Sequence, residues 1–174
     1  MINRQVRPLA LPTLLALALC GCASAEIKSN KSPGYSKKLD RLLIVFPVSK
    51  YMQEYEPLLK ERMVAELQKR GVAAVFAKMA ESLALEDAPS VDAQAKDFNA
   101  SNALLIRSTV GVITDSDRLL GQDFDAQLFD LASKTRVWRA EIRYNAGGSL
   151  NSTSARVDTL IGELVKTLSN DGLL

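Results

Sequence analysis

The sequence predicts an α/β (α+β) fold, in which about three helices pack on a five-stranded mixed sheet in the order β-α-β-α-β-β-β-α. Three observations predict it. A continuous apolar run, typical of a strand buried on both faces, precedes an amphipathic helix. A second apolar run and a second helical pattern follow. Three strand-like segments and a closing helix complete the chain, and we expect the helices to cover one face of the sheet.

The first two predicted strands are each followed by a helix. Residues 41–48 (RLLIVFPV) form the first apolar run, and an amphipathic helix is expected over 54–70. Gly71 is the expected stop, because glycine readily adopts the left-handed conformation that ends helices. Residues 72–77 (VAAVFA) predict the second strand. The helix after it is short, begins after Pro89-Ser90, and places three residues on one face: Val91, Ala95 and Phe98.

The remaining strands are expected to follow one another directly. Residues 103–114 (ALLIRSTVGVIT) predict a long strand, and 124–131 with 136–145 predict a hairpin around the turn 132–135. A final helix is expected over 152–168, with the most regular apolar stripe of the chain. Along the last strand one set of side chains faces the core and the other faces away: Trp138, Ala140, Ile142 and Tyr144 against Val137, Arg139, Glu141 and Arg143.

The N-terminal stretch 1–21 has the composition of an export signal. Arg4 and Arg7 make a positively charged start, and an apolar run of 11 residues extends from Leu9 to Leu19. A helix of that length spans roughly 17 Å, against a hydrocarbon core of roughly 30 Å. The run is therefore too short for a membrane span, and its length suits a signal peptide.

The end of that stretch resembles the lipobox of bacterial lipoproteins. Leu19 and Gly21 occupy the places where that family has a leucine and a small residue before the lipidated cysteine, so Cys22 is the predicted attachment site. Cys20 fits less well, since Leu19 would fill its small-residue position. The resemblance implies several acyl chains on Cys22, which anchor firmly where a single chain binds marginally. The alternative is an ordinary signal peptide that ends in Cys-Ala-Ser-Ala.

Residues 22–38 are expected to be the lipidated cysteine with a flexible tether, and residues 39–174 a single α/β domain. The tether is small, polar and basic, with one Pro and one Gly. Its lysines either touch anionic head groups or, as we favour, keep the linker soluble. Ala23 and Ser24 stand after the cysteine in place of Asp, which resembles sorting to the outer membrane, on its periplasmic face.

Composition removes several classes of function. The chain has no histidine, which excludes histidine-dependent triads and histidine metal ligands. Its two cysteines, Cys20 and Cys22, stand at the cleavage site, so the mature domain has no disulfide and no Cys/His zinc site. Loss of Arg4 and Arg7 with the signal lowers Lys plus Arg from 22 to 20, equal to Asp plus Glu at 20. An exported domain of balanced charge is not expected to bind nucleic acid.

Two patterns suggest a bound ion, and each has a plainer interpretation that we favour. Asp115-Ser116-Asp117 with Asp123 and Asp125 lacks the glycine and late glutamate of a calcium loop, so a solvated loop is expected. Gly147-Gly148-Ser149 precedes a helix, where backbone amides can hold an anion. No phosphate-binding pattern accompanies it, and a flexible junction capped at residue 151 or 152 is expected.

Trp138 is either an exposed sugar-stacking platform or, as its alternation favours, a core residue. No Ser-x-x-Lys dyad occurs, and pairs of carboxylates for glycoside cleavage cannot be located from spacing. We therefore expect a protein that is not an enzyme, with no metal site and no cofactor besides the covalent lipid on Cys22.

The phrase FDAQLFDLASKTRVWRAEIRY resembles a loose group of envelope proteins, in which Leu128-Phe129-Asp130 and Val137-Trp138-Arg139 flank a polar turn. The group includes the TolB amino-terminal domain, LpoB, PelC and CsgG, and the likeness in element order covers roughly residues 40–170. It implies binding or assembly rather than catalysis. The tether is shorter than in LpoB-like activators, and no membrane-inserting hairpin of the CsgG kind is predicted.

The sequence thus favours a membrane-anchored envelope lipoprotein that acts as a non-catalytic binding or assembly module in the periplasm. Its partner is expected to be an envelope protein or further copies of itself. One alternative, suggested by the PelC and CsgG resemblance, is a ring-forming accessory lipoprotein of a polysaccharide or protein export system. Another is an envelope hydrolase that uses carboxylates. The sheet face with Arg139, Glu141 and Arg143 is expected either to face solvent or to meet a partner.

Overall fold

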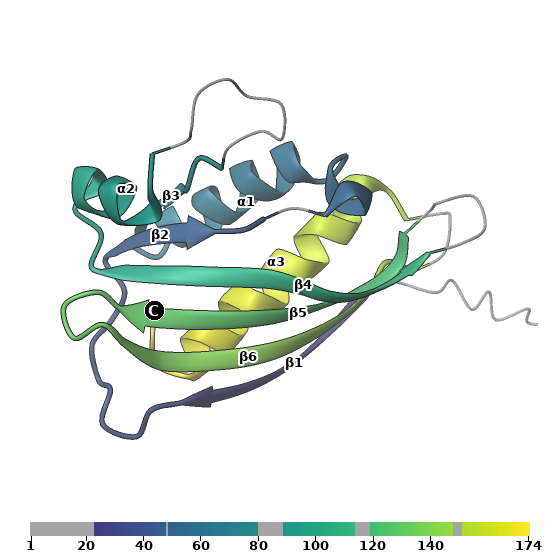
Figure 1. Cartoon of the computed structure of the whole chain (residues 1–174). Helices are drawn as coiled ribbons and strands as arrows, with labels where there is room; N and C mark the ends of the chain where they lie inside the picture. The colour runs from purple at the N-terminus through teal and green to yellow at the C-terminus, as the bar shows by residue number, and fades with distance from the viewer. Residues whose placement is uncertain (1–22, 48, 80–88, 114–118, 148–150) are drawn as a thin grey trace, which may run out of the picture.

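The computed structural model describes residues 23–47, 49–79, 89–113, 119–147 and 151–174 (Figure 1). They form a six-stranded mixed sheet with three α-helices, in the strand order β1-β6-β5-β4-β2-β3. The predicted class and the three helices are confirmed, whereas the predicted number of five strands is one too low.

The parallel half of the sheet consists of two strand–helix–strand units. β2 (Arg41–Val45) lies between β3 (Ala73–Phe76) and β4 (Asn102–Ile113) and runs parallel to both. Helix α1 (Glu56–Gln68) connects β2 to β3, and α2 (Val91–Phe98) stands between β3 and β4. Parallel neighbours need such crossovers, and each crossover places a helix on a face of the sheet.

The antiparallel half follows the predicted order of long strands. β5 (Leu119–Asp130) pairs with β4 on one side and with β6 (Thr135–Asn145) on the other. β4 and β5 each have 12 residues against five in β2, so their far ends project beyond the parallel half (Figure 1). The closing helix α3 (Thr153–Asn170) packs behind these strands.

The sixth strand lies in the segment predicted to be a flexible tether, and the structure corrects that expectation for residues 24–31. β1 (Ser24–Lys31) pairs antiparallel with β6 along its whole length, from Ser24 opposite Asn145 to Lys31 opposite Trp138. The folded domain therefore begins at least 15 residues before the predicted boundary at Leu39.

β1 is a half-buried edge strand. Ala25 and Ile27 pack against the core, while Glu26 and Lys28 point outward. This is the two-residue period of a strand with one covered face. Only two apolar residues carry the pattern, and the surrounding residues are polar. The strand is stabilised by the exposed edge of β6, which a local sequence window does not contain.

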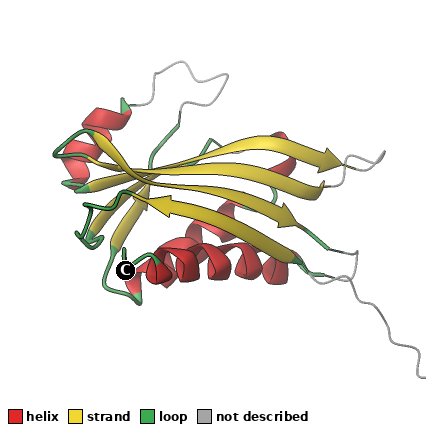
Figure 2. Ribbon diagram, turned by 90° about the horizontal axis from the view of Figure 1, so that it is seen from below, coloured by secondary structure: helices red, strands yellow, loops and turns green. Residues whose placement is uncertain are grey.

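The helices lie on both faces of the sheet, not on one face as predicted (Figure 2). α1 and α3 cover the face to which Leu42 and Ile44 contribute, and the main core is there. α2 lies on the other face, where Leu43 and Val45 pack with Ala95. Successive residues of a strand point to opposite faces, so a continuous apolar run requires a cover on each side. The prediction that β2 is buried on both faces is confirmed.

β6 shows the predicted alternation with one exception. Its four predicted core residues are buried, but Val137, predicted to face away, is buried as well. Val137 has no opposite residue in β5, since Leu128 lies opposite Trp138 and the next residue, Phe129, lies opposite Arg136. A β-bulge of this kind inserts one extra residue and re-aims its side chain.

Candidate functional site

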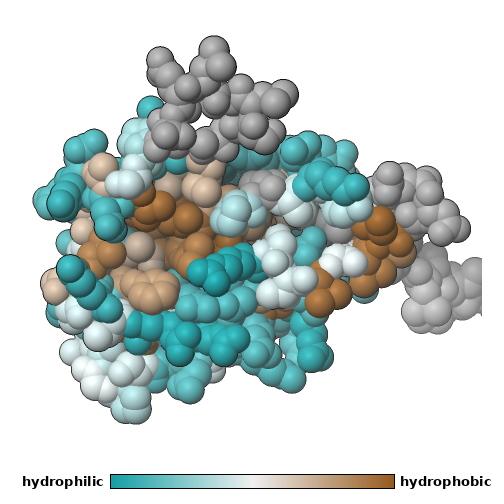
Figure 3. Space-filling view, viewed as in Figure 1, coloured by the Kyte–Doolittle hydropathy of each residue, from teal (hydrophilic) through white to brown (hydrophobic). Residues whose placement is uncertain are grey.

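Among the described residues no helix lies on the face of β5, β6 and β1 opposite α1 and α3, and polar side chains cover much of this face (Figure 3). α2 covers only the neighbouring part of the sheet, over β2. We call this surface the open face and define it by the outward-pointing residues of four strands: Glu26, Lys28, Arg107, Asp123, Asp125, Gln127, Arg139, Glu141 and Arg143.

Strand register brings charges of both signs together on the open face. Directly opposed side chains on a sheet lie about 5 Å apart, close enough to attract or repel. Two rows of directly opposed residues cross the face: Lys28, Glu141, Asp125 and Arg107 in one, and Glu26, Arg143 and Asp123 in the next. The face therefore has no uniform sign, and it suits a surface that is itself patterned with both charges.

Arg139 is the centre of this network. Its Nε donates to an oxygen of Asp125 at 2.7 Å, and its guanidinium lies 3.9 Å from Glu141. Partial burial alone raises the pKa of the Asp125 carboxyl, but hydrogen bonds from Arg139 and Gln127 outweigh that effect and hold the pKa below its usual range. Half of the Arg139 side chain is exposed, so its guanidinium stays within reach of a partner.

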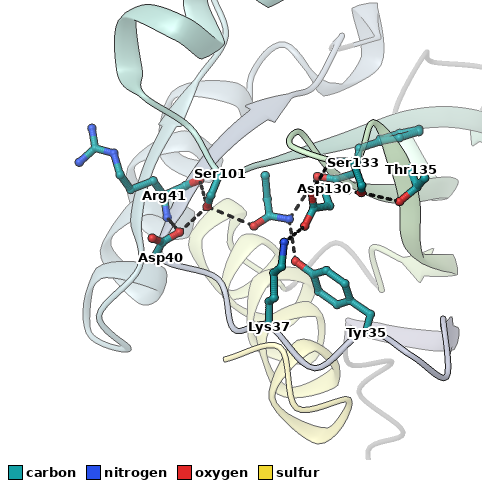
Figure 4. Close-up of polar contacts among 10 residues, drawn as sticks. Tyr35, Lys37, Asp40, Arg41, Ser101, Asp130, Ser133 and Thr135 are labelled. Atoms are coloured by element: carbon teal, nitrogen blue, oxygen red, sulfur yellow. Dashed lines mark hydrogen bonds and ion pairs between the residues drawn. The ribbon is translucent and has the colours of Figure 1, made fainter.

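A second group of polar side chains lies at the C-terminal end of β5 (Figure 4). We call it the Asp130 cluster: Tyr35, Lys37, Asn102, Asp130 and Ser133. Lys37 donates to one carboxylate oxygen of Asp130 at 2.8 Å, and the amide and hydroxyl of Ser133 donate to the other at 2.9 and 3.1 Å. The amide nitrogen of Asn102 donates to the Tyr35 hydroxyl at 3.0 Å.

The Asp130 carboxylate is buried and saturated by these donors. The hydrogen bond from Lys37, followed by that from the Ser133 amide, lowers the pKa of Asp130 to about 2. A general acid or base works best with a pKa near the working pH. Asp130 is therefore suited to fastening the segment after β1 to the β5–β6 turn rather than to moving protons.

Asp40 and Ser101 lie next to this cluster (Figure 4). The Ser101 hydroxyl donates to Asp40, and this bond, followed by that from the Arg41 amide, lowers the pKa of the Asp40 carboxyl. A serine nucleophile needs an adjacent base that can accept its proton. A carboxylate of lowered pKa is a poor base, so the pair is suited to joining the starts of β2 and β4.

The acidic pattern found in the sequence is only partly visible. Residues 115–117 lie outside the described residues. Asp123 and Asp125 belong to β5 and take part in the open face, where each faces or neighbours an arginine of β6. Across the described ranges no three Asp, Glu, Cys or His side chains gather as a metal site would require.

The glycine-rich junction is described at Gly147 alone, since residues 148–149 are outside the described residues. Gly147 has a φ of 71°, which glycine adopts without strain, and its amide donates to the Asn145 side chain at 2.8 Å. Ser152 caps α3 by accepting the Ala155 amide at 3.2 Å. This confirms the predicted capping.

Trp138 is a core residue, as predicted, with only 1% of its surface exposed. Its indole N–H donates to the Asp171 carboxylate at 2.6 Å, just after α3. The alternative of an exposed sugar-stacking platform is wrong, because no ring face is accessible.

One buried charge was missed in the sequence. Arg156 of α3 is 6% exposed and donates to the Tyr55 hydroxyl at 2.8 Å. Nearby, burial raises the pKa of Tyr144. Arg156 precedes Leu160 and Leu164 at four-residue steps, so it lies on the apolar stripe of α3. This spacing indicates burial, but a charged side chain is ordinarily expected to face solvent.

Cys22, the predicted lipid site, lies outside the described residues, one residue before them. The helices among the described residues fall short of what a bilayer crossing demands in length or in apolar character.

No protein-family model and no curated protein sequence matches the chain. Solved structures share its fold. The PelC dodecamer from Paraburkholderia phytofirmans is 18% identical, with 83% of this chain and 95% of PelC covered and a TM-score of 0.52. A variant PelC dodecamer from the same organism is 15% identical, with 86% of this chain and 99% of the variant covered and a TM-score of 0.53. Lipoprotein GNA1162 from Neisseria meningitidis is less similar: it is 19% identical, 75% of this chain and 98% of GNA1162 are covered, and the TM-score is 0.44.

Proposed function

We propose that this protein is a lipid-anchored lipoprotein of the bacterial envelope that binds or assembles other components without catalysing a reaction. The observation that carries the proposal is the open face: aligned polar and charged side chains on four strands, exposed on β1, β4 and β6 and partly exposed on β5. No helix of the described residues covers its β5, β6 and β1 part. In contrast, the buried carboxylate of Asp130 already has three hydrogen-bond donors. Charge-patterned surfaces give specificity in recognition more than raw affinity.

The anchor is proposed at Cys22, with the domain on the periplasmic face of the outer membrane. Leu19 and Gly21 in the lipobox positions support the site, and Ala23 with Ser24 support outer-membrane sorting. Several acyl chains on one cysteine hold a protein in a bilayer essentially permanently. No cofactor besides this lipid belongs to the proposal.

A second, finer candidate is self-assembly into a ring that serves a polysaccharide or protein export system. The shared fold with PelC, whose crystal structures are dodecamers, supports it. The open face and the edge strand β1 offer the surfaces for such contacts, because an edge strand presents unpaired backbone groups.

Charge reversal at Arg139 tests both candidates. Arg139→Glu places like charges beside Asp125 and Glu141, so it should disrupt any complex that uses the open face. Arg70→Glu is the matched control, since Arg70 is also exposed and ion-paired, 3.0 Å from Glu66 on α1. Crosslinking in intact envelopes, followed by native mass measurement, should show a defined complex for the natural protein and for Arg70→Glu, and its loss for Arg139→Glu.

A protein that stays monomeric and free of partners at native density contradicts the proposal. So does a complex that survives Arg139→Glu unchanged. The anchor is tested separately, by Cys22→Ser, which should abolish acylation and release the protein from membranes. Normal processing and unchanged membrane fractionation of that variant would show that the lipid site is wrong.

A further inference from the structure

One end of the sheet brings the start of β1 into line with the projecting strands. Ser24 lies opposite Asn145, Asn145 opposite Gly121, and Gly121 opposite Val112. These four residues form one row across β1, β6, β5 and β4. Neighbouring strands are about 5 Å apart, so roughly 15 Å separates Ser24 from Val112.

Exposed apolar side chains gather at this end. Six large hydrophobic side chains among the described residues are exposed, and four of them lie here, on β4 and β5. Brown, hydrophobic atoms are visible at the right of Figure 3, at the end where the long strands project. We call them the apolar end: Val110 (57% exposed), Val112 (54%), Ile113 (37%) and Leu120 (37%).

At the apolar end the backbones of β4 and β5 are paired by hydrogen bonds. The buried side chain of Gln122 donates to the carbonyl of Val110 at 2.7 Å and so occupies a backbone acceptor left by the irregular register there. Gly121 allows β5 to approach β6 closely, because a Cβ at this position would lie 2.9 Å from the carbonyl oxygen of Tyr144. Backbone groups that meet hydrocarbon need internal partners, and here the ladder supplies them.

The lipid anchor is adjacent to this end. Ala23 alone separates Cys22 from Ser24, so the chain allows at most about 7 Å between the Cα atoms of Cys22 and of the first residue of β1. A flexible tether would have allowed the domain to turn freely above the membrane. With β1 fixed on β6, acyl chains on Cys22 bring the bilayer surface to the row that ends at Val112.

We propose that the apolar end is a second membrane contact, in which Val110, Val112, Ile113 and Leu120 rest in the lipid interface beside the acylated Cys22. This inference rests on the proposed anchor. A bilayer, rather than a protein, is the occupant because Cys22 fixes a lipid surface within reach, and apolar side chains gain stability on leaving water for the acyl boundary. The contact also sets the orientation of the domain, with its strands steeply inclined to the membrane.

A fluorophore on a new cysteine tests the contact. Val112→Cys is introduced in the full chain, expressed in the envelope, purified, labelled with an environment-sensitive nitrobenzoxadiazole and reconstituted in vesicles of phosphatidylethanolamine and phosphatidylglycerol. Cys20 leaves with the signal and Cys22 is acylated, so the new thiol alone reacts, and peptide mass verifies this. Ala132→Cys, exposed in the turn at the opposite end of β5, is the matched control. Ile113→Cys replaces Val112→Cys if that variant fails to fold.

The label at 112 should shift to shorter wavelength in vesicles and lose emission when nitroxide-bearing lipids are added. The label at 132 should do neither. If the protein is acylated and bound to vesicles but its label at 112 stays in water, the contact is refuted and the proposed anchor is supported. A protein without acyl chains by intact mass, whose label is found at 112 and not at Cys22 by peptide mass and is quenched by lipid, supports the contact and refutes the anchor. Equal quenching at both positions refutes the proposed orientation and with it the contact.

Discussion

Removal of the Asp130 charge should make the protein less stable at neutral pH and alter its response to acid. The pKa of Asp130 falls from its ordinary 3.8 to about 2 in the folded protein. Because the folded state holds its proton less tightly than the unfolded state, the stabilisation is complete above pH 3.8 and is lost as the pH falls towards 2. The lowering corresponds to roughly 2 kcal/mol. The Asp130 side chain is 5% exposed, but that of Lys37 is 66% exposed, so solvent screens the pair in part and roughly 2 kcal/mol is an upper figure.

The assay is urea unfolding of the natural protein and of Asp130→Asn between pH 7 and pH 2. Asp130→Asn should lower the free energy of unfolding by up to about 2 kcal/mol at pH 7. The difference between the two proteins should shrink between pH 4 and pH 2. Lys37→Gln should reproduce much of the loss, because the hydrogen bond from Lys37 is the largest cause of the lowered pKa. A difference that is constant from pH 7 to pH 2 would refute the ion-pair account of this cluster.

Three further outcomes follow from the packing. Trp138→Phe removes the donor and Asp171→Ala removes the acceptor of the 2.6 Å indole bond. Each should lower the free energy of unfolding by roughly 1–3 kcal/mol, and the double variant should lose less than the sum of the two, whereas additive losses would contradict a shared bond. Ser152→Ala should destabilise the protein by about 1 kcal/mol through loss of the α3 cap. Ser154→Ala, at the second residue of the helix, should not. Ile27→Ser should speed amide hydrogen exchange in β1 far more than Asn30→Ser, since only Ile27 packs on the core; equal effects would refute the packing of β1.

The elements predicted well from the sequence are those whose pattern is local and strong. The stripe of α3 and the double-sided apolar run of β2 each have enough apolar residues within one element to specify its type. β1 could not be found in that way. Its two inward residues, Ala25 and Ile27, give a weak alternation, and its stability comes from β6, more than 100 residues away in the chain.

The candidate site was harder to predict because its geometry is nonlocal. Arg139 and Glu141 were placed on the outward face of their strand correctly, since alternation within one strand suffices for that. Their neighbours Asp125 and Lys28 depend on the register of three strands. Lys37 and Asp130 are 93 positions apart, and nothing in either local sequence indicates their ion pair. The position of α2 on the second face likewise follows from packing that no window of the sequence contains.

The short distance between Cys22 and β1 restricts how copies of this protein can assemble. If all copies are anchored in one leaflet by the same end, their contacts must be made by surfaces that run along the strands: the open face, the helical face and the outer edges of β1 and β3. Cyclic symmetry about the membrane normal keeps every anchor on one side, whereas dihedral symmetry places half of the anchors on the far side. A ring is then compatible with the anchor, and the end with Asp130 remains directed away from the membrane. Arg139→Glu should break such a ring without affecting the lipid contact of Val112, because the two residues serve different surfaces.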